Sequence, residues 1–79
     1  MHIDIISPDK TIFSGEVKSV VLPGSEGNFG ILNKHAAMIS TLRKGKIKVI
    51  DSQSQTQYFD ISGGVAEVNN NKVIALVEN

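Results

Sequence analysis

The stretch KIKVID, residues 46–51, shows the fold class most clearly because its apolar and polar side chains alternate. In an extended chain Ile47 and Val49 fall on one face, whereas Lys46 and Lys48 fall on the other. A repeat of two residues is the pattern of a β-strand with one face on a core and the other toward solvent. The stretch therefore predicts a half-buried strand.

Comparable short segments occur on both sides of this strand, and residues that favour turns separate them. The further strand candidates are residues 2–7, 11–22, 29–32, 38–42, 58–61, 65–68 and 72–77. The turn candidates are residues 8–10, 43–45, 52–57, 63–64 and 69–71. Within the second strand candidate, Gly15 predicts a bulge or a bend. About eight to ten short strands at this spacing predict an all-β fold, a small β-sandwich or flattened barrel.

Residues 33–42 leave an alternative open. Their apolar positions have nearly helical spacing, and Asn33 is a candidate N-cap. A helix this short is marginal in isolation, and the β-branched Ile39 and Thr41 disfavour it further. We therefore favour a strand in the second half of the segment and keep a short helix as the alternative.

The apolar positions of the strand candidates predict the core, with one face of each strand turned inward. The residues expected inside are Ile31, Ile39, Ile47, Val65, Val68, Val73 and Leu76. Two segments, residues 20–22 and 73–77, are apolar on both faces. In so small a chain, such strands predict that another protein covers part of the outer surface.

Length and composition limit the possible functions. The 79 residues contain no linker, repeat or charge block, which predicts one domain spanning residues 1–79. Eight basic residues balance eight acidic ones, so the basic excess of a nucleic-acid-binding protein is missing. The absence of cysteine excludes disulfides and thiolate metal ligands, and the longest apolar run, residues 73–77, is far shorter than a membrane helix of about 20 residues. We expect no enzyme activity, cofactor, metal ion or membrane insertion.

Three glycines recur at every third position in GSEGNFG: Gly24, Gly27 and Gly30. Their spacing fits neither a P-loop nor a dinucleotide-binding fingerprint, and Glu26 would place a negative charge in a phosphate cradle. We interpret the segment as a sharply turned loop in which glycine permits positive φ or close backbone approach. Phe29 either packs beneath this loop or contacts a partner.

His35 is the main candidate for chemistry. No serine lies in a nucleophile-elbow context, and His2 is too distant in sequence to share metal-ligand spacing with His35. Because His35 lies beside two alanines, we interpret it as a hydrogen-bonded structural residue. Proton sensing or partner contact is the functional alternative.

Two groups of basic residues have competing interpretations. Lys10 lies at a predicted turn between strands, as does the modified lysine of biotinyl and lipoyl carrier domains, so a carrier role is the alternative function. The turn in RKGKIK, residues 43–48, holds half of all the basic residues. Its lysines fit a solvated hairpin that resists aggregation, or a positive patch that steers an acidic protein or lies near anionic lipid.

Several motifs occur in an order that is specific in combination. They are IFSGEV at 12–17, LPGSEGNFGIL at 22–32, His35-Ala36, KGKIKV at 44–49, ISGGVAEV at 61–68 and KVIALVE at 72–78. In these motifs the chain resembles the N-terminal β-sandwich domain of the epsilon subunit of F-type ATP synthases. The resemblance covers nearly the whole sequence.

This resemblance implies a non-catalytic subunit at the foot of the rotating central stalk, peripheral to the cytoplasmic face of a bacterial membrane. One face of the sandwich would pack on the gamma subunit, and a loop at one end would touch the c-ring. The domain would couple ring rotation, driven by protons or sodium ions, to gamma. The implied ring-contact residues are Ser25, Glu26, Gly27, Asn28, Phe29 and Gly30, with the side chains of Ser25, Glu26, Asn28 and Phe29 exposed.

The chain also departs from the family pattern. Asn28 stands where relatives commonly carry an acid that would meet a basic ring loop, so the amide predicts a less electrostatic contact. Relatives commonly continue into a C-terminal helical hairpin that can inhibit ATP hydrolysis and, in some members, bind ATP. The sequence stops at Asn79. We therefore expect no C-terminal helical domain, and neither function of that hairpin.

Overall fold

The computed structural model describes residues 1–34 and 36–78, and all regular elements in this part of the chain are β-strands. The eight strands are β1 His2–Ile6, β2 Thr11–Gly24, β3 Gly27–Leu32, β4 Met38–Leu42, β5 Gly45–Asp51, β6 Thr56–Ile61, β7 Gly63–Asn69 and β8 Lys72–Glu78. The all-β prediction is confirmed. The alternative of a helix reaching into residues 38–42 is wrong, because these residues pair with β7 as strand β4.

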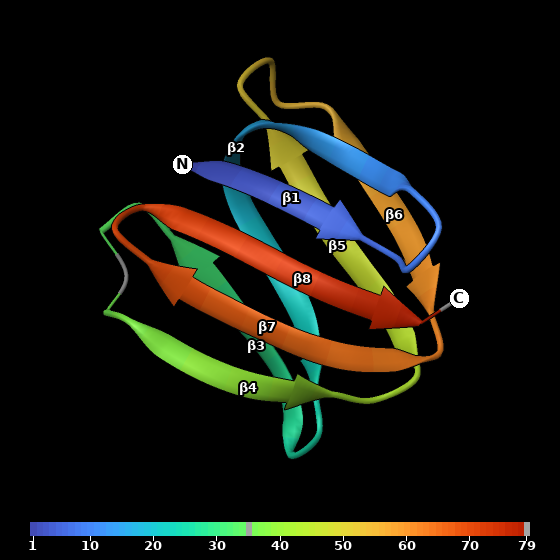
Figure 1. Cartoon of the computed structure of the whole chain (residues 1–79). Helices are drawn as coiled ribbons and strands as arrows, with labels where there is room; N and C mark the ends of the chain where they lie inside the picture. The colour runs from blue at the N-terminus through green and yellow to red at the C-terminus, as the bar shows by residue number, and fades with distance from the viewer. Residues whose placement is uncertain (35, 79) are drawn as a thin grey trace.

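The strands form a sandwich because one long strand belongs to both layers (Figure 1). The first half of β2 pairs antiparallel with β1, and its second half lies between β3 and β5. In the front layer of Figure 1, β1 pairs in parallel with β8, which continues through β7 to β4. The other layer runs from β3 through β2 and β5 to β6.

The turns agree in part with the sequence predictions. Asn70 and Asn71 have positive φ angles of 48° and 62°, the conformation that a two-residue hairpin between β7 and β8 requires. The bulge predicted at Gly15 is absent, because Gly15 pairs in register with Ile3. The pairing of β2 is irregular instead at Ile12, where the register with β1 shifts, and at Lys18, where the register with β5 shifts. The corner predicted at 63–64 lies one residue earlier, and both glycines begin β7.

Sixteen apolar side chains form the buried core between the two layers. Of the predicted core residues, Ile31, Ile47, Val68 and Val73 are buried. Three others are not: Ile39 is 71% exposed, Leu76 55% and Val65 40%.

The error concerns the face that each strand turns inward. On β7 and β8 the inward positions include the small residues Ala66 and Ala75, which pair directly opposite each other. Val65 and Leu76 form the adjacent pair and therefore point outward. Val65 and Val68 are three residues apart, as are Val73 and Leu76, so neither pair can share one face of a regular strand. Glu67 and Asn69 lie on the outward face of β7 with Val65, whereas β8 is apolar on both faces over residues 73–77.

Candidate functional site

The glycine-rich segment forms the β2–β3 hairpin, which extends beyond both layers at one end of the sandwich (Figure 1). Gly24 pairs with Gly27, and Ser25 and Glu26 form the turn between them. A Cβ atom on Gly24 would lie 2.7 Å from the Gly27 carbonyl oxygen and 2.7 Å from Cε1 of Phe29. Glycine at this position lets the hairpin close and lets the aromatic ring lie against the backbone.

The hairpin presents most of the predicted contact residues to solvent. Ser25, Glu26, Gly27, Asn28 and Gly30 are all exposed. These positions are compatible with the predicted ring contact, which remains a prediction.

Phe29 differs from the exposed side chain that the resemblance implies. It is half-buried and packs against the core cluster. Of the two alternatives for this ring, packing beneath the loop therefore describes the isolated chain better. Phe29 packs the hairpin against the sandwich, and part of its ring stays exposed.

Hydrogen bonds tie the hairpin to the end of β4. Arg43 donates through Nε to the Gly24 carbonyl oxygen at 3.1 Å and through Nη2 to Oδ1 of Asn28 at 3.3 Å. The hydroxyls of Ser25 and Thr41 lie 2.7 Å apart. Sequence analysis placed Arg43 only in a basic turn, and its contact with the hairpin depends on a pairing between segments distant in sequence.

Two further candidates from the sequence are His35 and Lys10. His35 lies outside the described residues, so its predicted structural or partner-contact role stays a prediction. Lys10 is exposed in the turn between β1 and β2, and its carbonyl oxygen accepts a hydrogen bond from the Ser7 backbone amide at 2.9 Å.

An exposed apolar surface lies on the outer side of β4, β7 and β8, and we call it the apolar face. It comprises Ile39, Val65 and Leu76, the residues that sequence analysis placed in the core. Val65 and Ile6 lie directly opposite Leu76 on the two neighbouring strands. A shallow hollow lined partly by Ile6, Pro8, Val65 and Leu76 continues this surface toward β1.

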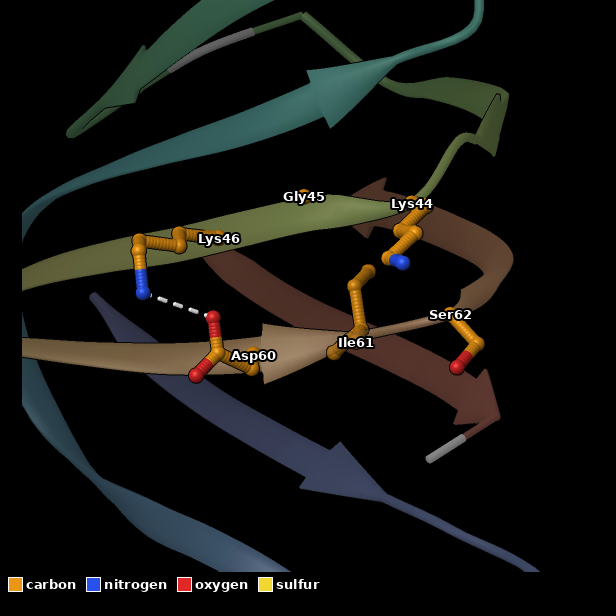
Figure 2. A pocket seen from close by; sticks show the side chains of 6 residues that line it. All are labelled: Lys44, Gly45, Lys46, Asp60, Ile61 and Ser62. Atoms are coloured by element: carbon orange, nitrogen blue, oxygen red, sulfur yellow. Dashed lines mark hydrogen bonds and ion pairs between the residues drawn. The ribbon is translucent and has the colours of Figure 1, made fainter.

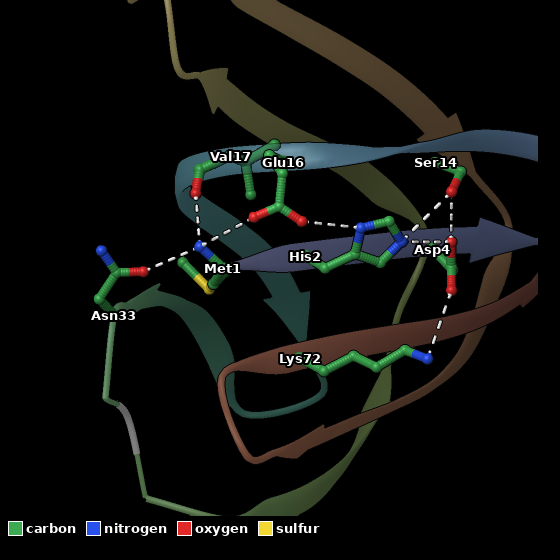
Figure 3. Close-up of polar contacts among 8 residues, drawn as sticks. All are labelled: Met1, His2, Asp4, Ser14, Glu16, Val17, Asn33 and Lys72. Atoms are coloured by element: carbon green, nitrogen blue, oxygen red, sulfur yellow. Dashed lines mark hydrogen bonds and ion pairs between the residues drawn. The ribbon is translucent and has the colours of Figure 1, made fainter.

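The other end of the β1–β8 surface is polar and centred on His2 (Figure 3). Its Nδ1 lies 3.0 Å from the Glu16 carboxylate and its Nε2 lies 3.0 Å from that of Asp4. Both partners accept hydrogen bonds, so the doubly protonated ring satisfies both contacts. Lys72 approaches Asp4 at 3.9 Å.

These contacts shift two pKa values in opposite directions. Hydrogen bonds with Asp4, and then with Glu16, raise the pKa of His2. A hydrogen bond from Ser14 at 2.6 Å, and then the contact with His2, lowers the pKa of Asp4. The cluster joins β1 to β2 through charged hydrogen bonds at an exposed site, where solvent screens them.

The basic turn predicted at 43–45 connects β4 to β5 beside the hairpin. Figure 2 shows Lys44 and Lys46 around the start of β5, facing Asp60 and Ile61 at the C-terminal end of β6. Nζ of Lys46 donates to the Asp60 carboxylate at 2.7 Å, and both side chains are largely exposed.

No helix among the described residues could cross a membrane. Within residues 1–34 and 36–78, no group of three or more histidine, aspartate or glutamate side chains is placed to hold a metal ion. The β2–β3 hairpin and the apolar face are the candidate functional surfaces among the described residues.

The comparisons with known proteins agree with this fold. The sequence model described as "ATP synthase, Delta/Epsilon chain, beta-sandwich domain" matches residues 1–79. The chain belongs to this family. Its resemblance to ATP synthase epsilon subunits, expected from the motifs, is thereby confirmed.

Curated members of the family are similar over almost the whole chain. The ATP synthase epsilon chain of Caulobacter vibrioides is 44% identical over 99% of this chain and 90% of the relative. The epsilon chain of Chlorobium limicola is 43% identical over 96% of this chain and 86% of the relative. That of Alkalilimnicola ehrlichii is 40% identical over 99% of this chain but only 56% of the relative, so members of the family differ in length.

Solved structures share the fold. A chain in the OSCP/F1/c-ring structure of the Euglena gracilis mitochondrial ATP synthase superposes with a TM-score of 0.91 and 25% identity, covering 98% of this chain and 49% of that one. A chain in the central stalk and c-ring structure of the Tetrahymena thermophila enzyme superposes with a TM-score of 0.83 at 20% identity, covering 100% of this chain and 63% of that one. The second likeness concerns the fold only.

Proposed function

We propose that this chain is a non-catalytic epsilon subunit of an F-type ATP synthase that links the gamma subunit to the c-ring. In this role it couples ring rotation, driven by protons or sodium ions, to ATP synthesis at the catalytic subunits. It lies peripherally on the cytoplasmic face of a bacterial membrane. Family membership supports the identity of the complex, and the Euglena structure contains F1 and the c-ring together with a chain of this fold.

The single observation that carries the proposal is the apolar face. Ile39, Val65 and Leu76 are exposed on neighbouring strands of an 8.5 kDa chain. Val65 and Leu76 lie directly opposite each other, whereas Ile39 pairs with Glu67 and lies diagonal to Val65. Exposed large apolar side chains grouped on one face favour burial against another protein. We assign this face to the gamma subunit, because it is broad, apolar and formed by rigid strands.

The β2–β3 hairpin provides the second contact. It extends beyond the two layers at one end of the sandwich, so a partner can reach it while the apolar face is covered (Figure 1). The exposed residues at its tip, 25–28, are polar or glycine, as expected of a loop that meets the polar loops of a ring. Two contacts on separate parts of one rigid domain are what a linking subunit requires.

The test replaces Leu76 by aspartate in the source organism and measures incorporation into the purified ATP synthase. A buried charge and the lost apolar contact should reduce incorporation at least about tenfold. The matched control is Gln53→Asp, which adds the same charge in the exposed turn after β5. The isolated Leu76→Asp chain should remain folded by circular dichroism.

Two results would contradict this assignment. Wild-type incorporation of Leu76→Asp would show that gamma binds elsewhere. Absence of the wild-type chain from the purified complex would remove the proposed function itself.

A further inference from the structure

A hollow on the outer side of β2, β5 and β6 combines basic side chains with an apolar floor, and we call it the basic hollow. It adjoins the β2–β3 hairpin, since Pro23 and Asn28 form part of its wall. The residues that line it are Val21, Pro23, Asn28, Arg43, Lys44, Gly45, Lys46, Lys48 and Tyr58.

The basic hollow has an excess of positive charge. It holds four of the eight basic residues of a chain whose net charge is zero. Among the described residues, only Lys46 of these four forms an ion pair, with Asp60. The side chain of Arg43 donates hydrogen bonds to neutral oxygens, those of Gly24 and Asn28. About three positive charges are therefore left to attract an anionic partner.

Asn28 contributes to this excess by being neutral. Its Oδ1 accepts the hydrogen bond from Nη2 of Arg43 at 3.3 Å. A carboxylate in the same place would pair with the guanidinium and cancel one positive charge. The amide predicted a weakly electrostatic contact when considered by itself, but beside Arg43 it preserves a positive surface.

The shape of the basic hollow distinguishes between anionic partners. Val21, Lys48 and Tyr58 lie side by side on three paired strands, and Tyr58 is 59% exposed. A protruding loop can enter a hollow and place carboxylates near the lysines and apolar atoms on the floor. A flat lipid surface would contact only the rim, so a polypeptide fits better.

We propose that the basic hollow binds an acidic polypeptide loop of the subunit that the β2–β3 hairpin contacts. This inference rests on the proposed function, because the hairpin marks the side that faces the ring. The lysines steer the carboxylates of the loop and make the contact sensitive to salt. In this chain the epsilon side of the ring contact therefore supplies the positive charge. This is opposite in sign to the contact that the family resemblance implies, in which an acid at position 28 would meet a basic ring loop.

The test compares two double variants with the same change in charge. Lys46→Gln/Lys48→Gln removes two charges from the basic hollow, whereas Lys10→Gln/Lys72→Gln removes two elsewhere. Each chain is rebound to membranes that carry an ATP synthase depleted of this subunit. At low ionic strength the hollow variant should bind roughly three- to tenfold more weakly, and the control should match the wild type.

The same contact is tested further by raising the ionic strength and by a third variant, Asn28→Asp. Raising ionic strength from about 0.05 M to about 0.5 M should weaken the wild type more than the hollow variant. Asn28→Asp, which neutralises Arg43 without removing a lysine, should also weaken binding at low salt. Tighter binding by Asn28→Asp would overturn the inference, since it would indicate a basic partner.

The remaining outcomes separate the two proposals. Equal binding by the wild type, the hollow variant and the control would overturn this inference and leave the proposed function intact. Lysine-dependent binding to phosphatidylglycerol vesicles, with unchanged binding to the depleted complex, would overturn it in favour of lipid. Failure of the wild-type chain to bind the depleted complex would instead overturn the proposed function.

Discussion

The apolar face and the basic hollow lie on the outer sides of different layers of one sandwich, and they differ in chemistry. The apolar face presents Ile39, Val65 and Leu76, whereas the basic hollow presents lysines around Tyr58. Burial of apolar surface gives an affinity that salt hardly changes. Charged side chains instead attract an oppositely charged partner, and salt screens this attraction. If both proposals hold, a chain with no net charge would provide one contact that salt hardly changes and one that salt weakens, because the apolar and the basic residues lie on different layers.

The largest predicted effect concerns the pairing of β7 with β8, the two strands that carry Val65 and Leu76 of the apolar face. Gly64 has φ of 151°, and a Cβ on it would overlap the carbonyl oxygen of Leu76 on β8. Gly64→Ala should therefore separate β7 from β8 and lower the free energy of unfolding by about 3 kcal/mol or more. Urea denaturation of the isolated chain measures this change.

Gly15→Ala is the matched control for that substitution. A Cβ on Gly15 would meet only the ring of Phe13, at an ordinary distance of 3.5 Å. We expect its unfolding free energy to stay within about 1 kcal/mol of the wild type. Equal losses for the two variants would show that close approach of β7 to β8 does not support the apolar face.

An intermediate effect is expected at the hairpin. Phe29→Ala removes a half-buried ring from the core and should lower the free energy of unfolding by about 2 kcal/mol, less than for a fully buried phenylalanine. It should also weaken incorporation into the complex, although the chain stays folded. Leu32→Ala, at an exposed position at the end of β3, is the control. Unchanged stability would mean that the ring serves only as a contact.

The smallest effect is a pH dependence of stability from the cluster at β1. The raised pKa of His2 means that its contribution is fully present below the pKa of the unfolded chain and is lost as pH rises through the folded pKa. The melting temperature should therefore fall slightly from about pH 6 to about pH 8. His2→Gln should remove this part of the dependence, and an identical pH profile in that variant would contradict the assignment.

Asp4 gives the opposite trend at acidic pH. Its pKa is lowered, so its stabilising contribution is present above the ordinary value and is lost as pH falls through the folded pKa. Asp4→Asn should make the chain less sensitive to acid than the wild type.

Local patterns in the sequence predicted much of the fold. The alternation around Ile47 and Val49 places these residues in the core, and both are buried. Asn70 and Asn71 predicted the hairpin that joins β7 to β8, because asparagine tolerates positive φ. These features depend on residues close together in the chain, so the sequence alone could indicate them.

The functional surfaces depended on contacts that the sequence does not display. Leu76 belongs to a strand that is apolar on both faces over residues 73–77, and its pairing with Val65, beside the buried pair Ala66 and Ala75, places both large side chains outside. Arg43 and Asn28 are 15 positions apart in the chain. Arg43 nevertheless reaches Asn28, because the end of β4 pairs with the end of β2. Sequence by itself therefore determined the strands, the turns and the family, while tertiary structure decided which apolar residues a partner can cover and where the positive charges gather, because both follow from non-local strand pairing.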